Sequence, residues 1–216
     1  MTLTQREVKA VYKWTVKVRP VWGWWTPTAN TVAYYPLTSD ILDHSANGYN
    51  LSHASSGSVT YSNNMAISTD VLQYTSRQLL PTSWNFTIWF WCYPSSWNNI
   101  GDRDSWWPTW YMCNQSWDYK WNFILSNSWR RLGNTSSISW PMHMMVTRSG
   151  DTFTLYINWQ SNSTWSWGGS LRSAGNGFYI AGFSSWIGAI IIESVAWTAT
   201  EVSNYYDLTK WDYWVS

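Results

Sequence analysis

Short runs of alternating apolar and polar residues recur along the chain, each closed by Gly, Pro, Ser or Asn, a pattern typical of β-strands. The clearest run extends from Phe86 to Cys92. Its alternation would place Thr87, Trp89 and Trp91 on one face of a strand, and Phe86, Ile88, Phe90 and Cys92 on the other. Further strands are expected at 31–35, 59–61, 71–74, 109–113, 122–125, 142–148, 152–157, 178–181 and 189–196.

Two local motifs refine this pattern. The runs 145–148 and 152–157 flank Ser149-Gly150-Asp151, where Gly150 can supply the positive φ that a hairpin turn needs. Thr198 and Glu201 have the spacing of a capping box, which predicts a helix over 199–208. The sequence therefore predicts an all-β fold, a two-sheet antiparallel jelly-roll sandwich with one short C-terminal helix.

The first 29 residues differ from the rest. Two short strand-like runs, 8–12 and 15–18, precede a stretch that holds Pro20 and Pro27 and shows no periodicity. We expect an N-terminal β arm and linker at residues 1–29, followed by a single domain over residues 30–216. A sandwich of this length can bury an adequate core.

The charge content excludes several classes of partner. Charged residues make up 12% of the chain and the net charge is +1, which is too weak to hold nucleic acid or an anionic membrane. No apolar run reaches the ~18 residues of a membrane span, and the first 13 residues lack the apolar core of a secretory signal. A surface-type domain without an export signal favours an extracellular surface or a virion, such as a phage particle released by lysis.

Four motifs together resemble a known family. They are a D-x-S-x-N turn, an F-T-I-x-F-W strand, an H-x-x-V-T-R hairpin and a closing strand that leads into a helix, at residues 43–51, 86–91, 143–160 and 188–202. In order and spacing, from about Asn30 to Asp207, the chain resembles a laminin-G-like domain of the concanavalin A-like lectin and glucanase jelly rolls. The resemblance implies a non-catalytic module that binds carbohydrate or another surface polymer.

The resemblance also implies a structural Ca²⁺. In this family the closing strand usually carries an Asp-Glu pair, and an acid of this pair binds calcium together with the Asp of the first turn. In this chain, only Glu193 could take that role beside Asp43. Carboxylates and backbone carbonyls are suitable ligands for calcium. The alternative, which we favour, is that Asp43 only forms hydrogen bonds within its own turn.

Tryptophan is unusually abundant, with 22 Trp against 12 Gly. Asn158-Trp159 stands where a two-residue hairpin turn favours Asn-Gly. Others lie in turn-like contexts, namely Trp14, Trp117, Trp121, Trp129, Trp140, Trp165, Trp167, Trp211 and Trp214. We hypothesise that many of these are glycine in an organism that reads UGA as Gly, while Trp91 and Trp197 are genuine. The alternative is that the rings are real platforms for sugars.

Catalytic residues are not evident. Glu7, Glu193 and Glu201 have no acidic partner at the spacing of a glycosidase carboxylate pair, so we expect no enzyme. Of His44, His53 and His143, none has a metal-ligand spacing, and His143 in a strand is expected to be structural. Cys92 and Cys113 are predicted to be buried thiols in preference to a disulfide.

One polar and aromatic cluster could bind a glycan. It comprises Asp102, Asp104, Trp110, Tyr111 and Tyr119, although a solvated loop is the commoner interpretation of such residues. The alternative function is a structural protein of a virion or fibre that docks to neighbouring subunits by strand addition through residues 1–29. A glycoside hydrolase is a remote third option.

Overall fold

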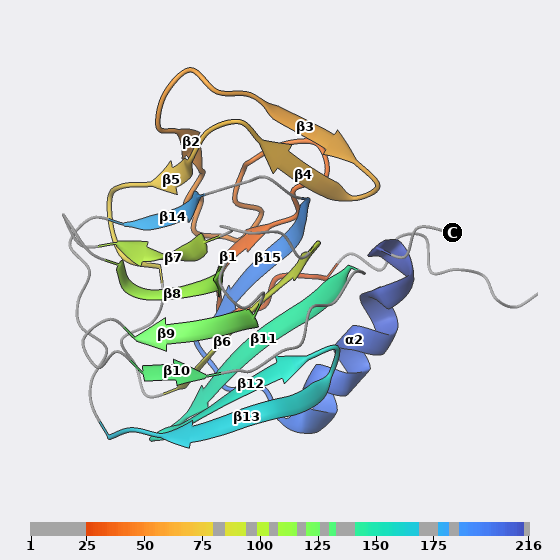
Figure 1. The fold of residues 1–216 in the computed structure, drawn as a ribbon. Coiled ribbons are helices and arrows are strands. Elements are labelled where there is room, and N and C mark those ends of the chain that lie inside the picture. Colours follow the sequence, from red (N-terminus) through yellow and green to blue (C-terminus); the bar gives the residue numbers. More distant parts are fainter. Residues whose placement is uncertain are drawn as a thin grey trace, which may run out of the picture.

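A computed structural model describes residues 25–79, 85–93, 99–103, 108–115, 120–125, 130–132, 141–168, 177–181 and 186–213. Most of the predicted arm, residues 1–24, lies outside this part of the chain. The described residues form two antiparallel sheets and a helix (Figure 1). The prediction of an all-β sandwich with one C-terminal helix is therefore confirmed.

The first sheet has eight strands in the order β13-β12-β11-β6-β15-β4-β3, and β1 also pairs with β15. Their bounds are β1 Thr31–Tyr35, β3 Val59–Ser62, β4 Met65–Ser68, β6 Asn85–Cys92, β11 Met142–Ser149, β12 Thr152–Ile157, β13 Gln160–Ser166 and β15 Ile187–Glu193. The sequence did not predict β4, and it indicated β13 only through the two-residue turn at Asn158-Trp159.

The second sheet has seven strands in the order β10-β9-β8-β7-β14-β5-β2. Their bounds are β2 Ser52–His53, β5 Leu72–Tyr74, β7 Asn99–Arg103, β8 Pro108–Gln115, β9 Lys120–Leu125, β10 Arg130–Leu132 and β14 Phe178–Ala181. Of these, β2, β7 and β10 were not predicted.

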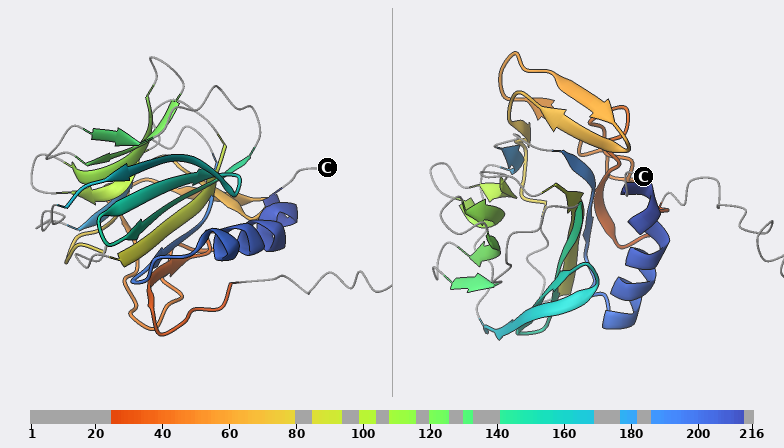
Figure 2. Two further views of the ribbon diagram at one scale, coloured as in Figure 1. Left: turned by 90° about the horizontal axis from the view of Figure 1, so that it is seen from below. Right: turned by 45° about the vertical axis from the view of Figure 1, so that its right-hand side comes forward.

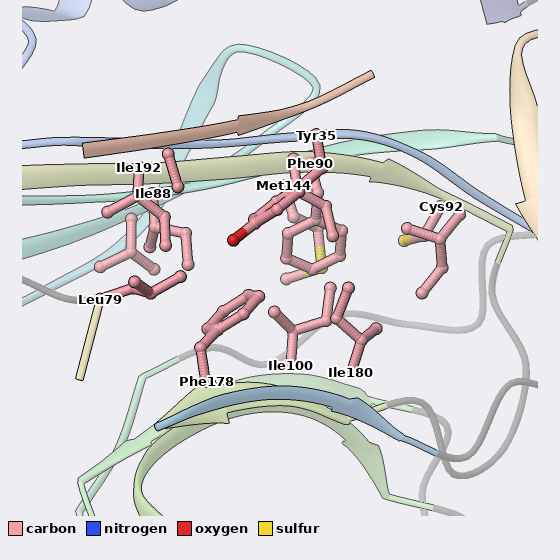
Figure 3. Close-up of a cluster of buried hydrophobic side chains, with 14 of the residues drawn as sticks. Tyr35, Leu79, Ile88, Phe90, Cys92, Ile100, Met144, Phe178, Ile180 and Ile192 are labelled. Atoms are coloured by element: carbon pink, nitrogen blue, oxygen red, sulfur yellow. The ribbon is translucent and has the colours of Figure 1, made fainter. Parts of the chain in front are cut away.

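The main core lies between the two sheets. Phe90 and Ile192 of the first sheet point toward Phe178, Ile100 and Ile180 of the second (Figure 3). Phe86, Ile88, Phe90 and Cys92 of β6 all belong to this core, as their alternation predicted. Cys92 is fully buried and free, without a disulfide, and burial raises the pKa of its thiol well above its usual value; the side chain of Cys113 lies outside the described residues.

The other face of the first sheet is covered by α2, Ala199–Tyr213 (Figure 2). Trp91 is fully buried there, stacks on Tyr213 with ring centroids 4.8 Å apart, and donates from Nε1 to Thr209. The helix approaches closely because Gly188 has no side chain: a Cβ there would lie 2.4 Å from the Tyr213 ring. This face of the sheet is thus a second core.

The start of α2 agrees with the predicted capping box. Glu201 N donates to Thr198 Oγ1 at 3.3 Å, and Thr198 N donates to Glu201 Oε2 at 2.7 Å. A cap of this kind contributes about 1 kcal/mol to helix stability. The helix continues to Tyr213, five residues beyond the predicted end, because its last turns pack on the sheet. Among the described residues, no helix is both long and apolar enough to cross a membrane.

His143 lies inside this second core and is structural, as predicted. It is fully buried, with ring centroids 5.2 Å from Trp91, 5.6 Å from Trp89 and 6.0 Å from Tyr206. Neither ring nitrogen has a hydrogen-bond partner among the described residues. Burial without a compensating partner lowers the pKa of His143 to about 3, so the ring is neutral at physiological pH.

The hairpin turns carry the backbone conformations that the sequence predicted. Gly150 joins β11 to β12 with φ +57°, while Asn158 and Trp159 join β12 to β13 with φ +48° and +69°. A bulky residue at such a φ is strained. The side chain of Trp159 is 45% exposed, so little packing offsets the strain.

The other described tryptophans do not occupy glycine-like backbone positions, while Trp14, Trp117, Trp129, Trp140 and Trp214 lie outside the described residues. Trp165 lies in β13 and Trp121 in β9, so their placement in turns was wrong. The Trp165 and Trp167 rings stack 6.0 Å apart and pack against the inter-sheet core. Among the described tryptophans, Trp159 has a positive φ and the others do not. The hypothesis that UGA codons are glycine in the source organism stays a prediction.

Candidate functional site

Three residues of the predicted cluster of acids and aromatics lie on the neighbouring strands β7 and β8. Asp102 lies in β7, where it is fully buried and accepts a hydrogen bond from Leu79 N at 3.2 Å. This burial gives Asp102 a structural position and removes its carboxylate from the surface. Trp110 and Tyr111 lie in β8, opposite Asp102 and Gly101 in the register. Asp104 and Tyr119 lie outside the described residues, so ligand binding at this cluster stays a prediction.

Asp43 organises the turn that follows β1. Its Oδ1 accepts hydrogen bonds from Tyr34 N and Ser45 N, and its Oδ2 accepts from Ser45 Oγ and Tyr49 N, all within 2.9 Å. A carboxylate offers about four acceptor positions, and these four donors occupy them. The favoured interpretation, in which Asp43 binds its own turn, agrees with this geometry.

Glu193, the second predicted calcium ligand, is buried at the end of β15. Its Oε1 accepts a hydrogen bond from Thr31 Oγ1 at 2.8 Å, and burial raises its pKa to about 6. Because Asp43 has no acceptor position left, the two carboxylates as arranged do not fit a shared calcium ion. No group of three or more His, Cys, Asp or Glu side chains in the described part of the chain could hold a metal. Calcium binding stays a prediction of the resemblance alone.

The same turn holds Tyr49 at one end of the sandwich. Asp43 Oδ2 accepts from Tyr49 N, and the buried Tyr35 hydroxyl donates to Tyr49 O at 2.7 Å. Gly48 before it has φ +67°, which reverses the chain. Both backbone groups of Tyr49 are therefore held by side chains anchored in the core, and this fixes the place of its half-buried ring.

A second tyrosine comes from the other side of this end. Tyr74 is the last residue of β5, and its ring lies 5.1 Å from that of Tyr49. Its backbone is packed tightly against Gly177, the residue before β14, where a Cβ would lie 1.9 Å from Tyr74 O. Gly177 also has φ +91°, so this approach requires glycine.

Arg77 completes the cluster. Its Cζ lies 5.3 Å from the centre of the Tyr49 ring, a distance typical of cation–π contacts. Its Nη1 donates to Tyr49 Oη at 3.1 Å, and its Nε donates to Gln78 O at 3.4 Å. We call Tyr49, Tyr74 and Arg77 the tyrosine–arginine cluster.

The chemistry of this cluster is that of recognition. Two half-buried aromatic faces can pack on the apolar face of a sugar ring, and an exposed guanidinium can donate to its oxygens. Sequence reasoning missed the cluster because its members come from separate segments, with Tyr49 and Arg77 28 residues apart. The D-x-S-x-N turn was the available signal, since Tyr49 follows its Asn47 by two residues.

Comparisons with known proteins place the fold. No protein-family model matches the sequence, and no curated protein is similar to it. Solved structures do match, at 14–16% identity, and they show a jelly-roll-like β-sandwich. Membership of the laminin-G-like family stays a prediction.

Three solved structures illustrate the similarity. Domain 4 of AbnA, a GH43 extracellular arabinanase from Geobacillus stearothermophilus in complex with arabinotriose, has a TM-score of 0.62 at 16% identity; the match covers 81% of this chain and 97% of that one. The binding domain of Paraclostridial Mosquitocidal Protein 1 has 0.61 at 15% identity, with 82% and 52% covered. The botulinum neurotoxin serotype D ligand binding domain in complex with N-acetylneuraminic acid has 0.60 at 14% identity, with 82% and 50% covered. The chain thus spans about half the length of the toxin binding domains.

Proposed function

We propose that this protein is a non-catalytic glycan-binding module and that the tyrosine–arginine cluster contacts the glycan. The observation that carries the proposal is the rigid placement of Tyr49 and Tyr74. Their rings are 5.1 Å apart and held by the Asp43 turn and by Gly177. Aromatic side chains with few rotatable bonds lose little entropy when they bind, which favours recognition.

Two similarities support this class of function. A structure with the same fold holds arabinotriose, and another holds N-acetylneuraminic acid. Fold alone does not determine function, so the similarity supports a class of ligand, and the cluster is the binding place that we propose for it. The sequence pairs no second acid with Glu193 at the spacing that glycosidases use, which favours binding over hydrolysis.

The test is a glycan array with the full chain, followed by calorimetry on the glycans that bind. Tyr74→Ala should weaken binding by more than about tenfold, because a central aromatic contact contributes about 2 kcal/mol or more. Trp211→Ala is the matched control, since Trp211 is an exposed aromatic on α2 with 69% of its surface accessible. Thermal melts show whether each variant is folded. Equal binding by Tyr74→Ala and wild type would exclude the cluster as the site.

A second candidate function is assembly into a fibre or a virion. It is favoured by β13, which ends the first sheet and pairs, among the described strands, with β12 alone. A free edge of this kind can accept a strand from a neighbour, and residues 1–29 of another copy are the proposed donor. Light scattering of the full chain and of a chain lacking residues 1–29 tests this: a monomer in both contradicts assembly. Either function suits an extracellular surface or a phage particle.

A further inference from the structure

Arg77 differs from the other cations whose side chains the structure describes. Arg148 is fully buried and lies over the Phe153 ring at 4.8 Å, and Lys210 Nζ pairs with Asp207 Oδ1 at 2.5 Å. Arg77 is exposed, and no carboxylate in the described part of the chain lies within ion-pair distance of it. Its charge is therefore available to a ligand.

The guanidinium is also held in a defined orientation. Of its five N–H groups, one donates to Gln78 O and one to Tyr49 Oη, so three remain, and they include both on Nη2. The guanidinium carbon also lies 5.3 Å from the centre of the Tyr49 ring. A planar guanidinium oriented by two hydrogen bonds and a cation–π contact loses little freedom when it binds a planar anion.

The remaining N–H groups match a carboxylate. One N–H on Nη1 and one on Nη2 can donate in parallel to the two oxygens of a carboxylate, the bidentate arrangement that arginine favours. The same anion would lie at the margin of the Tyr49 and Tyr74 rings, which face a sugar in the proposed function. The charge and the aromatic faces together then recognise one ligand.

We infer that the cluster selects glycans that carry a carboxylate, such as sialic or uronic acids, over neutral glycans. This inference rests on the proposed function. Arg77 is the specificity-determining residue, and Tyr49 orients it. A Tyr49→Phe substitution keeps the ring and removes the hydroxyl that accepts from Nη1, so it should weaken acidic ligands more than neutral ones.

The experiment compares ligands that differ only in charge. Trigalacturonic acid is measured against its methyl ester, and 3′-sialyllactose against its methyl ester, by calorimetry with the full chain at low ionic strength. Wild type should prefer the acid of at least one pair. Arg77→Gln should weaken that acid about tenfold to hundredfold, since a hydrogen bond to a charged group is lost, and should weaken the neutral partner much less. Arg77→Lys keeps the charge without the planar fork and should be intermediate.

Lys210→Gln is the matched control, because it removes the same charge from α2 and should change neither ligand. Equal binding of acid and neutral partner in both pairs overturns the selectivity and leaves the proposed function standing. If wild type binds sulfated galactose but neither of the two carboxylate ligands, the carboxylate selectivity is also overturned. If folded wild type binds no glycan at all, both the proposed function and this inference fail.

Discussion

Acidification should destabilise the protein through His143. In the folded state the pKa of this imidazole is about 3, whereas in the unfolded chain it is about 6.5. The unfolded state therefore binds a proton at a higher pH than the folded state. The stabilisation that results is complete above pH 6.5, declines as the pH falls from 6.5 toward 3, and is absent below 3.

The magnitude follows from the two pKa values. At pH 4.5 the unfolded imidazole is almost fully protonated, two pH units below its pKa, while the folded imidazole is still neutral. At 1.36 kcal/mol per unit, the free energy of unfolding should fall by roughly 3 kcal/mol between pH 7.5 and pH 4.5. That is a large fraction of the stability of an ordinary domain.

The assay is urea denaturation at a series of pH values, for wild type and for His143→Phe. Phenylalanine has a similar size, suits the aromatic surroundings and needs no hydrogen-bond partner. Other groups also titrate in this window. Burial raises the pKa of Glu193 to about 6, so protonation of Glu193 increases the free energy of unfolding as the pH falls. The difference between the two proteins removes such contributions and isolates His143.

Between pH 7.5 and pH 4.5, the free energy of unfolding of wild type should fall by roughly 3 kcal/mol more than that of His143→Phe. At pH 7.5 the variant should be at least as stable as wild type, since it removes two buried nitrogens without hydrogen-bond partners. Parallel curves for the two proteins would refute the argument that His143 is buried and neutral.

Four further outcomes are expected. Trp159→Gly should raise the free energy of unfolding by about 1 kcal/mol, because it relieves a φ of +69°; a lower melting temperature would contradict this. Gly188→Ala should cost about 1–3 kcal/mol, because the new Cβ would meet the Tyr213 ring, and near-normal stability in urea would contradict that packing. Adding millimolar Ca²⁺ or a chelator should leave the melting temperature unchanged, because four hydrogen bonds occupy the acceptor positions of Asp43. A melting temperature that rises with Ca²⁺ in wild type, but not in Asp43→Asn, would contradict this and support the predicted calcium site. Finally, the intact mass of the natively expressed protein should be lower than that expected for 22 Trp, and a match to 22 Trp ends the recoding hypothesis.

Alternation of side chains predicted most of the strands and their inner faces. In β6 it separated Phe86, Ile88, Phe90 and Cys92 from Trp89 and Trp91, and the structure does the same. The pattern could not show that the second face is buried too, because that depends on α2 arriving from more than a hundred residues away. Two strands lacked an apolar pattern altogether: β13 is a polar edge strand, and β7 ends in the charged Asp102 and Arg103.

The candidate site was less predictable than the fold. Asp102 appeared to be a surface acid in the sequence, but its carboxylate is buried beside Leu79 N. The tyrosine–arginine cluster joins a turn, a strand end and a loop, and no local pattern connects these segments. What the sequence did contain was the Asp43 turn, whose hydrogen bonds fix Tyr49.

The position of α2 in the chain determines when this protein can complete its fold. The earliest described strand, β1, pairs with the latest, β15, and α2 follows both. During synthesis, Trp89 and Trp91 would stay uncovered until the ribosome had released residue 213, long after their own strand had emerged. The nascent chain thus exposes these aromatic side chains from the synthesis of β6 to that of α2, and a chaperone that shields apolar surfaces would act in that interval.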